Sequence, residues 1–216
     1  KPVVSTVNIS GATSFCQGAG VELSVTNNPV YTYQWKKNGS DISGATTSAY
    51  IAQSSGLYSL IITNTSGCYY KTEDVNVTTF PAPAAPFIST NRPIQFCQND
   101  SVVLSVTQTA GFSYQWKLNG GAVGSNTYLF SAKNAGSYNV IVSNSSGCSA
   151  PSLNSVNVIV NSLPFVSAVN LSGPTTFCNG GSINLSIPFT SGYTYRWRNE
   201  NGLIAGSNTN SFTASA

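Results

Sequence analysis

The chain of 216 residues contains no histidine and no methionine, and only 7% of its residues are charged. A typical soluble domain is about 25% charged. The lack of histidine removes the commonest general base and a frequent metal ligand. Six acidic residues cannot easily fill several calcium sites, because each site takes several oxygen ligands. We therefore expect no catalytic residue, no cofactor and no metal ion, and a protein that is not an enzyme.

Long apolar runs are also missing. No stretch approaches the roughly 18 residues of a membrane helix. The first residues, Lys1-Pro2-Val3-Val4, lack the apolar core of a signal peptide, so we expect a chain that is cytosolic or already processed. A net charge of +3 is too weak a field to suggest nucleic-acid binding. Yet 41% of the residues are hydrophobic and 11% are aromatic, which favours a folded protein over a disordered one.

What the sequence does contain is an internal repeat of about 81 residues, the first feature to seek in any chain. The segments FCQGAGVELSV, FCQNDSVVLSV and FCNGGSINLSI recur at this period, as do YTYQWKKNG, FSYQWKLNG and YTYRWRNENG. A third segment occurs only twice, as SGLYSLIITNTSGC and AGSYNVIVSNSSGC. Proline-containing joints separate the units. We predict repeats at 1–82, 83–163 and 164–216, the third lacking its last two strands.

Within a repeat the hydrophobic period is two. Val21, Leu23 and Val25 alternate with Glu22 and Ser24, as expected of strands with one buried face. The dipeptides Asn38-Gly39 and Asn119-Gly120, which follow Trp35 and Trp116, favour the positive φ angles of tight hairpin turns. Short alternating strands with frequent turn signals predict an all-β chain of tandem β-sandwiches, without helices.

These motifs resemble a known family. A tryptophan on a third strand, then Asn-Gly, then Gly-x-Tyr on a later strand is similar to an immunoglobulin-like domain of the intermediate type. The resemblance implies core tryptophans at Trp35, Trp116 and Trp197, and tyrosine corners at Tyr58 and Tyr138. The combination is similar to the Ig-like repeats of Bacteroidetes surface adhesins and secreted multidomain proteins.

The cysteines depart from the immunoglobulin pattern. The usual inter-sheet disulfide would join positions occupied here by Val25 and Leu60, and by Val106 and Val140. The actual cysteines precede the second strand or follow the sixth. We interpret them as disulfides, which implies an extracellular, exported protein. The cysteines concerned are Cys16, Cys68, Cys97, Cys148 and Cys178.

Two pairings of these cysteines remain open. The simpler joins Cys16 to Cys68 and Cys97 to Cys148 within repeats, and leaves the partner of Cys178 beyond residue 216. However, in an immunoglobulin sandwich these positions lie at opposite ends, which could separate them by ~20 Å. Head-to-tail stacking would instead permit a Cys16–Cys148 bridge between repeats.

A few aromatic residues are candidates for ligand contact, because amphipathic rings suit saccharide faces. Those that precede the core tryptophans, and an unrepeated pair after the sixth strand, are Tyr31, Phe112, Tyr193, Tyr69 and Tyr70. Each has an alternative interpretation as a packed strand residue.

The third repeat ends at residue 216, before its sixth strand. Since the loss of a central strand exposes apolar surface and unpaired backbone, we expect this end to be a boundary of the fragment or of visible density. Completion by a strand from another chain is the rarer alternative.

The functional expectation is a non-catalytic stalk or adhesin segment of a larger exported cell-surface protein, which presents a distal head. One alternative is a carbohydrate-binding or spacer module of a secreted polysaccharide-degrading enzyme. Another is a filament subunit completed by strand exchange. Expected partners are other Ig-like repeats of the chain, surface glycans or another cell-surface protein.

Overall fold

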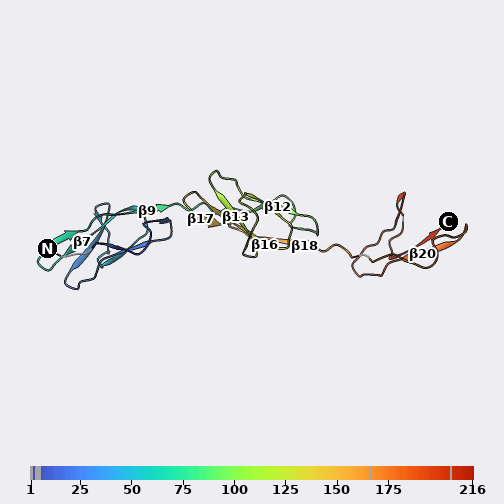
Figure 1. Cartoon of the computed structure of the whole chain (residues 1–216), viewed down its shortest axis with the longest axis horizontal. Helices are drawn as coiled ribbons and strands as arrows, with labels where there is room; N and C mark the ends of the chain where they lie inside the picture. Colours follow the sequence, from blue (N-terminus) through green and yellow to red (C-terminus); the bar gives the residue numbers. More distant parts are fainter. Residues whose placement is uncertain (1, 3–5, 166, 205) are drawn as a thin grey trace. The chain divides into compact units, whose positions relative to one another are not determined.

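The structure is a computed structural model that describes residues 2, 6–165, 167–204 and 206–216. Every regular element in these ranges is a β-strand (Figure 1). Short alternating segments separated by glycine and asparagine turns leave little room for any other element. In the described ranges, no helix is long and apolar enough to cross a membrane. The all-β prediction is confirmed.

The first repeat folds as two facing sheets. One has the order β1-β3-β6, and the other has the order β2-β9-β7-β4-β5, with β8 also paired to β7. The strands are β1 (Asn8–Ile9), β2 (Ser14–Cys16), β3 (Val21–Ser24), β4 (Thr32–Lys37), β5 (Ser40–Asp41), β6 (Ala49–Ala52), β7 (Gly56–Thr63), β8 (Tyr69–Lys71) and β9 (Val75–Phe80).

The second repeat reproduces this topology strand for strand. Its sheets have the orders β10-β12-β15 and β11-β18-β16-β13-β14, with β17 paired to β16. The strands are β10 (Ser89–Thr90), β11 (Gln95–Cys97), β12 (Val102–Ser105), β13 (Ser113–Leu118), β14 (Gly121–Val123), β15 (Leu129–Ala132), β16 (Gly136–Ser143), β17 (Ser149–Pro151) and β18 (Val156–Asn161). The chain is therefore a tandem of Ig-like sandwiches, as the repeat predicts.

Each of these sandwiches has its own core between its two sheets. Trp35 and Trp116 are both 0% exposed and lie at the centres of separate clusters of buried residues. Each indole Nε1–H donates to a backbone carbonyl, that of Thr47 at 3.0 Å and that of Thr127 at 2.9 Å. Because each core is complete within one repeat, neither sandwich needs the other to bury its apolar face.

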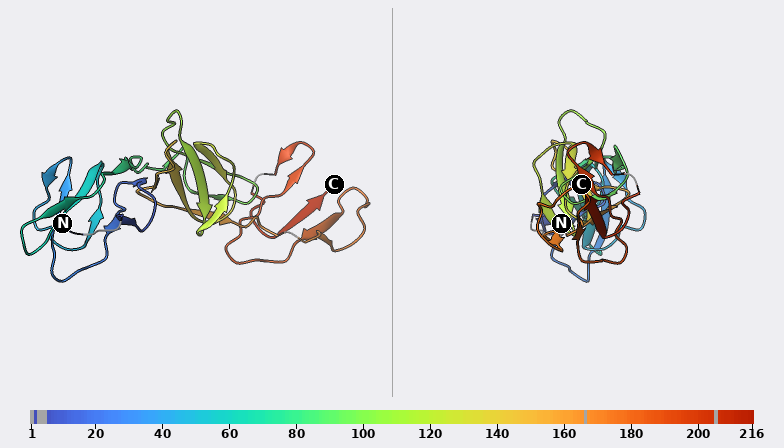
Figure 2. Two further views of the ribbon diagram at one scale, coloured as in Figure 1. Left: turned by 60° about the vertical axis from the view of Figure 1, so that its left-hand side comes forward. Right: turned by 90° about the vertical axis from the view of Figure 1, so that its right-hand side faces the viewer.

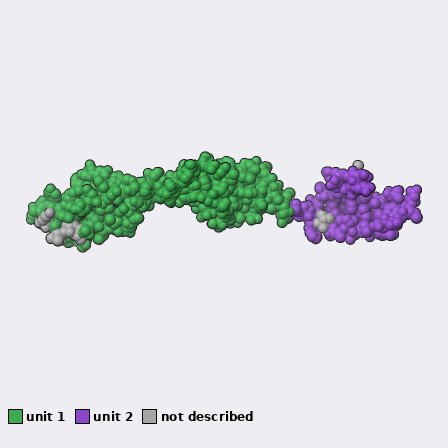
Figure 3. Space-filling model, turned by 45° about the horizontal axis from the view of Figure 1, so that its top comes forward, with its two compact units in different colours: residues 1–160 green, residues 161–216 purple. Residues whose placement is uncertain are grey.

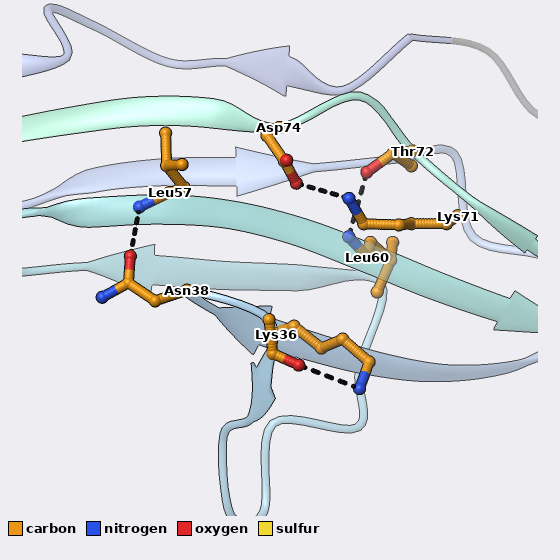
Figure 4. Close-up of polar contacts among 8 residues, drawn as sticks. Lys36, Asn38, Leu57, Leu60, Lys71, Thr72 and Asp74 are labelled. Carbon is orange, nitrogen blue, oxygen red and sulfur yellow. Dashed lines mark hydrogen bonds and ion pairs between the residues drawn. The ribbon is translucent and has the colours of Figure 1, made fainter.

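Local turn chemistry explains the hairpin after each tryptophan. Asn38 and Gly39 have φ angles of 48° and 82°, and Asn119 and Gly120 repeat this pair at 50° and 85°. Asparagine and glycine tolerate this left-handed region, which matches the twist of the two strands being joined. The Asn38 side chain adds a tertiary contact, since its Oδ1 accepts a hydrogen bond from the Leu57 N–H at 2.9 Å (Figure 4).

In the first repeat, β8 and β9 both pair with β7, but residues 72–74 between them are not part of a strand. A buried side chain in this gap supplies a hydrogen bond that strand pairing would otherwise provide. Thr72 Oγ1 accepts the Leu60 N–H at 2.9 Å (Figure 4), so the backbone of central strand β7 stays paired where β8 ends. Ser152 does the same for Val140 in the second repeat. A buried N–H without such a partner would cost about 1–3 kcal/mol.

The chain forms two compact units, residues 1–160 and 161–216 (Figure 3). The first unit holds both complete sandwiches. The division of this unit at residues 82 and 83, and the start of the third repeat at residue 164, remain predictions.

The second unit, residues 161–216, contains a three-stranded sheet β19-β20-β23 and a hairpin β21-β22 (Figure 2). These strands correspond to β1, β3 and β6, and to parts of β4 and β5, of the first repeat. Their bounds are β19 (Asn170–Leu171), β20 (Ser182–Ser186), β21 (Arg198–Asn199), β22 (Gly202–Leu203) and β23 (Ser211–Ser215).

Local contacts in the second unit match those of the complete sandwiches, but burial does not. Trp197 Nε1 donates to the Thr209 carbonyl at 3.0 Å, as in the other repeats. The ring of Trp197 is nevertheless partly exposed. In the first repeat Trp35 lies opposite Leu60 of β7, and the described part of 161–216 has no strand in that place. The sequence-local contact forms without it, whereas full burial requires it.

Candidate functional site at the joint between the first two repeats

In the first repeat, the early edge strand β2 and the last strand β9 end at the same end of the sandwich. β2 pairs with β9 in parallel, and Cys16 lies opposite Phe80 in this register. The Gln17 N–H then donates to the Phe80 carbonyl at 2.9 Å. Because β9 runs directly into the connection to the second repeat, the parallel pairing carries Cys16 to the joint.

The turn after β7 in the first repeat and the turn after β16 in the second repeat are built identically. In the first repeat Asn64 Oδ1 accepts the N–H groups of Ser66 and Cys68, at 3.1 and 2.9 Å. Asn144 does the same for Ser146 and Cys148 at 3.1 and 3.0 Å. This asparagine turn ends in Ser-Gly-Cys, and its glycine (Gly67 or Gly147) has a φ angle near 78°, a value that L side chains rarely adopt.

The structure joins Cys16 of the first repeat to Cys148 of the second (Cα–Cα 5.6 Å). The preferred pairing within repeats, Cys16 with Cys68 and Cys97 with Cys148, is therefore wrong. The reason is the parallel register of β2 and β9, which places Cys16 at the end of the sandwich facing the next repeat, while the turn containing Cys68 lies at the other end. The alternative bridge between repeats is the one observed.

Polar and apolar contacts surround this disulfide. The Asn144 amide Nδ2 donates to the Pro81 carbonyl at 2.9 Å, across 63 positions of sequence. Cys148 is 1% exposed, and its Sγ lies 3.8 Å from the Phe80 carbonyl oxygen. Pro83, in the connection itself, is buried. The joint is thus held by a covalent bond, a side-chain clamp and a packed connection.

A second clamp ties the connection to the second sandwich. Asn154 Oδ1 accepts the Ile88 N–H at 2.8 Å, and its Nδ2 donates to the Ile88 carbonyl at 3.0 Å. The Leu153 N–H donates to the Pro86 carbonyl at 2.8 Å. These bonds satisfy backbone groups that strand pairing leaves open, so the connection enters the second repeat in a fixed register.

The remaining cysteines of the described ranges, Cys68, Cys97 and Cys178, are free and exposed. Each occupies a position equivalent to one half of the observed bridge. Cys97 and Cys178 correspond to Cys16, and Cys68 corresponds to Cys148. In the described ranges no group of three or more Cys, Asp or Glu residues could hold a metal ion.

The candidate ligand-contact aromatics are not brought together. Tyr31 and Phe112 pack against the cores of the first and second sandwiches. Tyr193 lies on the wall of a cavity of about 650 Å³ within the second unit, with Phe165 and Tyr195 among its neighbours. In the first repeat the residue equivalent to Tyr195, Tyr33, lies opposite Ile62 of β7. We therefore relate the cavity to strand packing and not to a ligand.

The unrepeated aromatic pair lies on β8. Tyr69 is 65% exposed and lies opposite Thr63, while Tyr70 is half-buried and lies opposite Ile62. The corresponding residues of β17 are Ser149 and Ala150. Tyr69 is therefore the one candidate of the five with a largely open ring face, and it is adjacent in sequence to free Cys68.

The tyrosines assigned to corners make the contacts that the resemblance implies. Tyr58 Oη donates to the Ser54 carbonyl and Tyr138 Oη to the Asn134 carbonyl, both at 2.9 Å. Burial raises the pKa of the Tyr138 phenol above its usual 10.0, although the bond to Asn134 opposes the shift. The Tyr138 hydroxyl therefore acts in the fold as a neutral donor.

Charged groups form isolated surface pairs. Lys71 Nζ lies 2.7 Å from Asp74 Oδ1 (Figure 4), and Arg92 lies 2.6 Å from Asp100. Hydrogen bonds from Lys71 and from Arg92 lower the pKa values of Asp74 and Asp100 below their usual 3.8. Single exposed ion pairs contribute little to the stability of a fold. We therefore assign no functional role to these two pairs.

Sequence reasoning missed Asn144 and Asn154. Both sit in loops rich in asparagine and serine, where no residue type distinguishes a clamp from a solvated side chain. A usable signal was the recurrence of Asn-x-Ser-Gly-Cys in both complete repeats, since an asparagine that accepts N–H groups two and four residues later shapes the turn that presents the cysteine.

Comparisons with known proteins agree with this architecture. A model of the family described as "Ig-like domain CHU_C associated" matches residues 83–162. No curated protein sequence matches the chain.

Several solved structures are similar to the chain at low identity. A three-domain titin fragment, I67–I69, is 11% identical, with 94% of this chain and 83% of that chain covered, at a TM-score of 0.43. Murine CEACAM1b is 16% identical, covering 72% and 99%, with a TM-score of 0.37. A Bacteroides ovatus protein, SGBP-B of a mixed-linkage glucan utilization locus, is 13% identical, covering 99% and 67%, with a TM-score of 0.29.

Proposed function

We propose that this chain of tandem Ig-like sandwiches, in which residues 83–162 match the model of the CHU_C-associated Ig-like family, is a non-catalytic spacer segment of an exported surface protein. In this proposal the repeats hold a binding or catalytic head away from the cell. The segment contributes distance and a controlled joint, and it carries out no reaction.

One observation carries the proposal, the disulfide between two sandwiches whose cores are each complete. A disulfide inside a repeat would support the fold of that repeat. A disulfide from Cys16 to Cys148 adds nothing to either core, but it restricts how the two sandwiches move against each other. Such a restriction is useful where neighbouring modules must keep a fixed spacing, and it persists only in an oxidising, extracytoplasmic setting.

The test is mechanical. When the full chain is pulled from its two ends, the bridge shields the 132-residue separation between Cys16 and Cys148 from extension. At roughly 3.4 Å per residue, reduction should lengthen the fully stretched chain by about 450 Å. Single-molecule stretching, without and with a reductant, measures this difference.

Matched variants make the result specific. A double variant, Cys16→Ser with Cys148→Ser, should extend like the reduced chain, whereas Cys68→Ser should extend like the oxidised one. Equal extension with and without reductant would refute the mechanical proposal. Export is tested separately, by labelling the exposed Cys97 on intact producing cells with a membrane-impermeant maleimide. Failure to label would contradict a surface location.

One observation favours a second candidate, a module that contacts glycans. Tyr69 presents an open ring face on β8, and amphipathic rings of this kind pack on apolar faces of sugars. Binding on a glycan array that is lost in Tyr69→Ala and kept in Tyr31→Phe would support this candidate. An array without reproducible binding would exclude it for the glycans presented.

A further inference from the structure

Asparagine is a thermolabile residue, and a glycine that follows it offers a backbone nitrogen that no side chain shields. Asn38-Gly39 and Asn119-Gly120 form the hairpin turns after the core tryptophans. Asn179-Gly180 lies in the turn after Cys178, and Asn201-Gly202 lies in the hairpin β21-β22. The asparagines at positions 38, 119 and 179 differ in how the fold holds them.

Two hydrogen bonds, which we call the hairpin clamp, hold each of the first two asparagines. The Asn119 N–H donates to the Ser137 carbonyl at 2.9 Å, and Asn119 Oδ1 accepts the Ser137 N–H at 2.9 Å. Asn38 makes the same two bonds with Leu57, at 2.8 and 2.9 Å (Figure 4). A Cβ on Gly136 would lie 2.9 Å from Asn119 Oδ1, so the glycine before Ser137 gives this side chain its room.

Asn179 has no such clamp. Its side chain is exposed, and within the described residues it makes no hydrogen bond. The Gly181 N–H donates to the Cys178 carbonyl at 2.8 Å, which closes a tight turn with Asn179 and Gly180 at its centre. The Gly180 N–H itself has no acceptor in the described part of the chain. Both reacting groups of an asparagine–glycine pair are therefore open to solvent here.

Of the three repeats, only the third has asparagine at this position. The equivalent residues are Gln17 in the first repeat and Gln98 in the second. Glutamine reacts far more slowly than asparagine, because its longer side chain must close a larger ring. In the first repeat this position belongs to the joint, since the Gln17 N–H donates to the Phe80 carbonyl at 2.9 Å.

We propose that Asn179 is a site of spontaneous deamidation in the folded protein, and that the hairpin clamp protects Asn38 and Asn119 from the same reaction. The Gly180 backbone nitrogen loses its proton and attacks Asn179 Cγ. A new C–N bond closes a succinimide ring, while the bond from Cγ to the amide nitrogen breaks and ammonia leaves. This inference does not rest on the proposed spacer function.

Water completes the reaction without an oxidant or a cofactor. Opening of the ring between Cγ and the Gly180 nitrogen leaves an aspartate at position 179. Opening between the α-carbonyl carbon and the same nitrogen leaves an isoaspartate, in which the backbone runs through the former side chain and is longer by one methylene. Either product replaces a neutral amide with a carboxylate beside Cys178, so the net charge falls from its initial +3.

The chain supplies its own matched pair for the test. Asn119 and Asn179 are both exposed and both are followed by Gly-Gly, so they should react alike in an unfolded chain. The full chain is incubated at mildly alkaline pH, and mass spectrometry of its peptides follows both positions, with isoaspartyl methyltransferase labelling of the product. We expect Asn179 to react on the order of tenfold faster, because ring closure at Asn119 requires the hairpin clamp to open.

Two controls identify the cause of that difference. In guanidinium chloride, which unfolds the sandwiches, the two rates should converge. Asn179→Gln, which gives the third repeat the residue type of the other two, should abolish the isoaspartate signal from this peptide and leave the rate at Asn119 unchanged.

Several results would overturn the proposal. Equal rates at the two positions in the folded chain would do so, as would a faster reaction at Asn119. A folded chain that forms no product at position 179, although the unfolded chain does, would show that the fold protects this turn as well. A difference in rate that persists in guanidinium chloride would rule out the hairpin clamp as its cause.

Discussion

The turn at residues 64–68 and the turn at residues 144–148 have the same sequence pattern and the same internal hydrogen bonds, yet their cysteines have opposite surroundings. Cys68 is exposed, while Cys148 is 1% exposed and bonded to Cys16. The difference comes from what lies next to each turn. Local sequence builds the turn, and the end of the preceding sandwich decides whether its cysteine is covered.

The comparison also separates two uses of a disulfide. In small secreted domains, bridges substitute for a core that is too small. Here both cores are closed by Trp35, Trp116 and their neighbours without a cysteine in the inter-sheet position. The cysteines are then free to act between repeats, and the valine and leucine residues at the usual disulfide positions are part of that arrangement.

The largest expected effect concerns thiol reactivity. After mild reduction of the folded chain, Cys68 should react with iodoacetamide at the rate of an exposed thiol, while Cys148 should be slower by on the order of tenfold or more, since about 1.4 kcal/mol of opening free energy suffices for tenfold. Mass spectrometry of the alkylated peptides measures both rates. Equal rates would show that only the covalent bond covers Cys148.

A smaller effect is expected on the redox equilibrium of the Cys16–Cys148 bridge, which should respond to substitution of Asn144 but not of Asn64. Asn144→Ala removes the bond to the Pro81 carbonyl as well as the two turn bonds, whereas Asn64→Ala removes only turn bonds. A hydrogen bond contributes about 1 kcal/mol, which is roughly a fivefold change in an equilibrium. We expect Asn144→Ala to raise the reduced fraction of the Cys16–Cys148 bridge about fivefold in glutathione buffer.

Asn64→Ala is the matched control for that measurement and should leave the redox equilibrium of the bridge unchanged. Both variants should weaken their own turn to a similar degree in urea unfolding. If Asn64→Ala shifted the bridge as much as Asn144→Ala, the Pro81 contact would have no role in the joint.

The smallest expected effect is a pH dependence of folding stability at the Lys71–Asp74 ion pair, close to the turn that contains Cys68. Asp74 has a lowered pKa because Lys71 donates to it, and Pro151 and Asn154 replace this pair in the second repeat. A carboxyl whose pKa falls on folding stabilises the fold above its unfolded value near 3.8, and this stability is lost as the pH drops through the folded pKa. Thermal unfolding should show a small advantage over Asp74→Asn at pH 6.

That advantage should vanish well below pH 3.8, where both variants carry a neutral side chain. Asp100→Asn, which removes the partner of Arg92, is the matched control in the second repeat and should behave alike. A difference between wild type and Asp74→Asn that persists in acid would point to packing as its cause.

The sequence predicted the fold well because the signals for it are local and repeated. Alternating residues such as Val21 and Leu23 indicate strands, and Asn38-Gly39 indicates a specific hairpin turn. The joint was harder to predict, since it depends on which edge of a sheet β2 occupies. Parallel pairing with β9 sends Cys16 toward the next repeat, and no spacing between cysteines reveals that direction. Both pairings could be formulated from the sequence, but the pairing within repeats was preferred and is wrong.

Burial in the third repeat teaches the same lesson. The Trp197 indole makes the same kind of bond to a backbone carbonyl, that of Thr209, as the other two tryptophans make, but its ring is only partly covered. Residues close in sequence supply the hydrogen bond. Residues of β7, such as Leu60 opposite Trp35, supply the burial in the first repeat.

The exposed connection between the first two repeats gains protection from the bridge. Ala82, Ala84 and Phe87 are open to solvent, and exposed connections of this kind are where proteases cut. A cut there leaves the halves attached, because Cys16 and Cys148 lie on opposite sides of it. The joint therefore survives a nick in its backbone, and a nicked chain would separate into two fragments only after reduction.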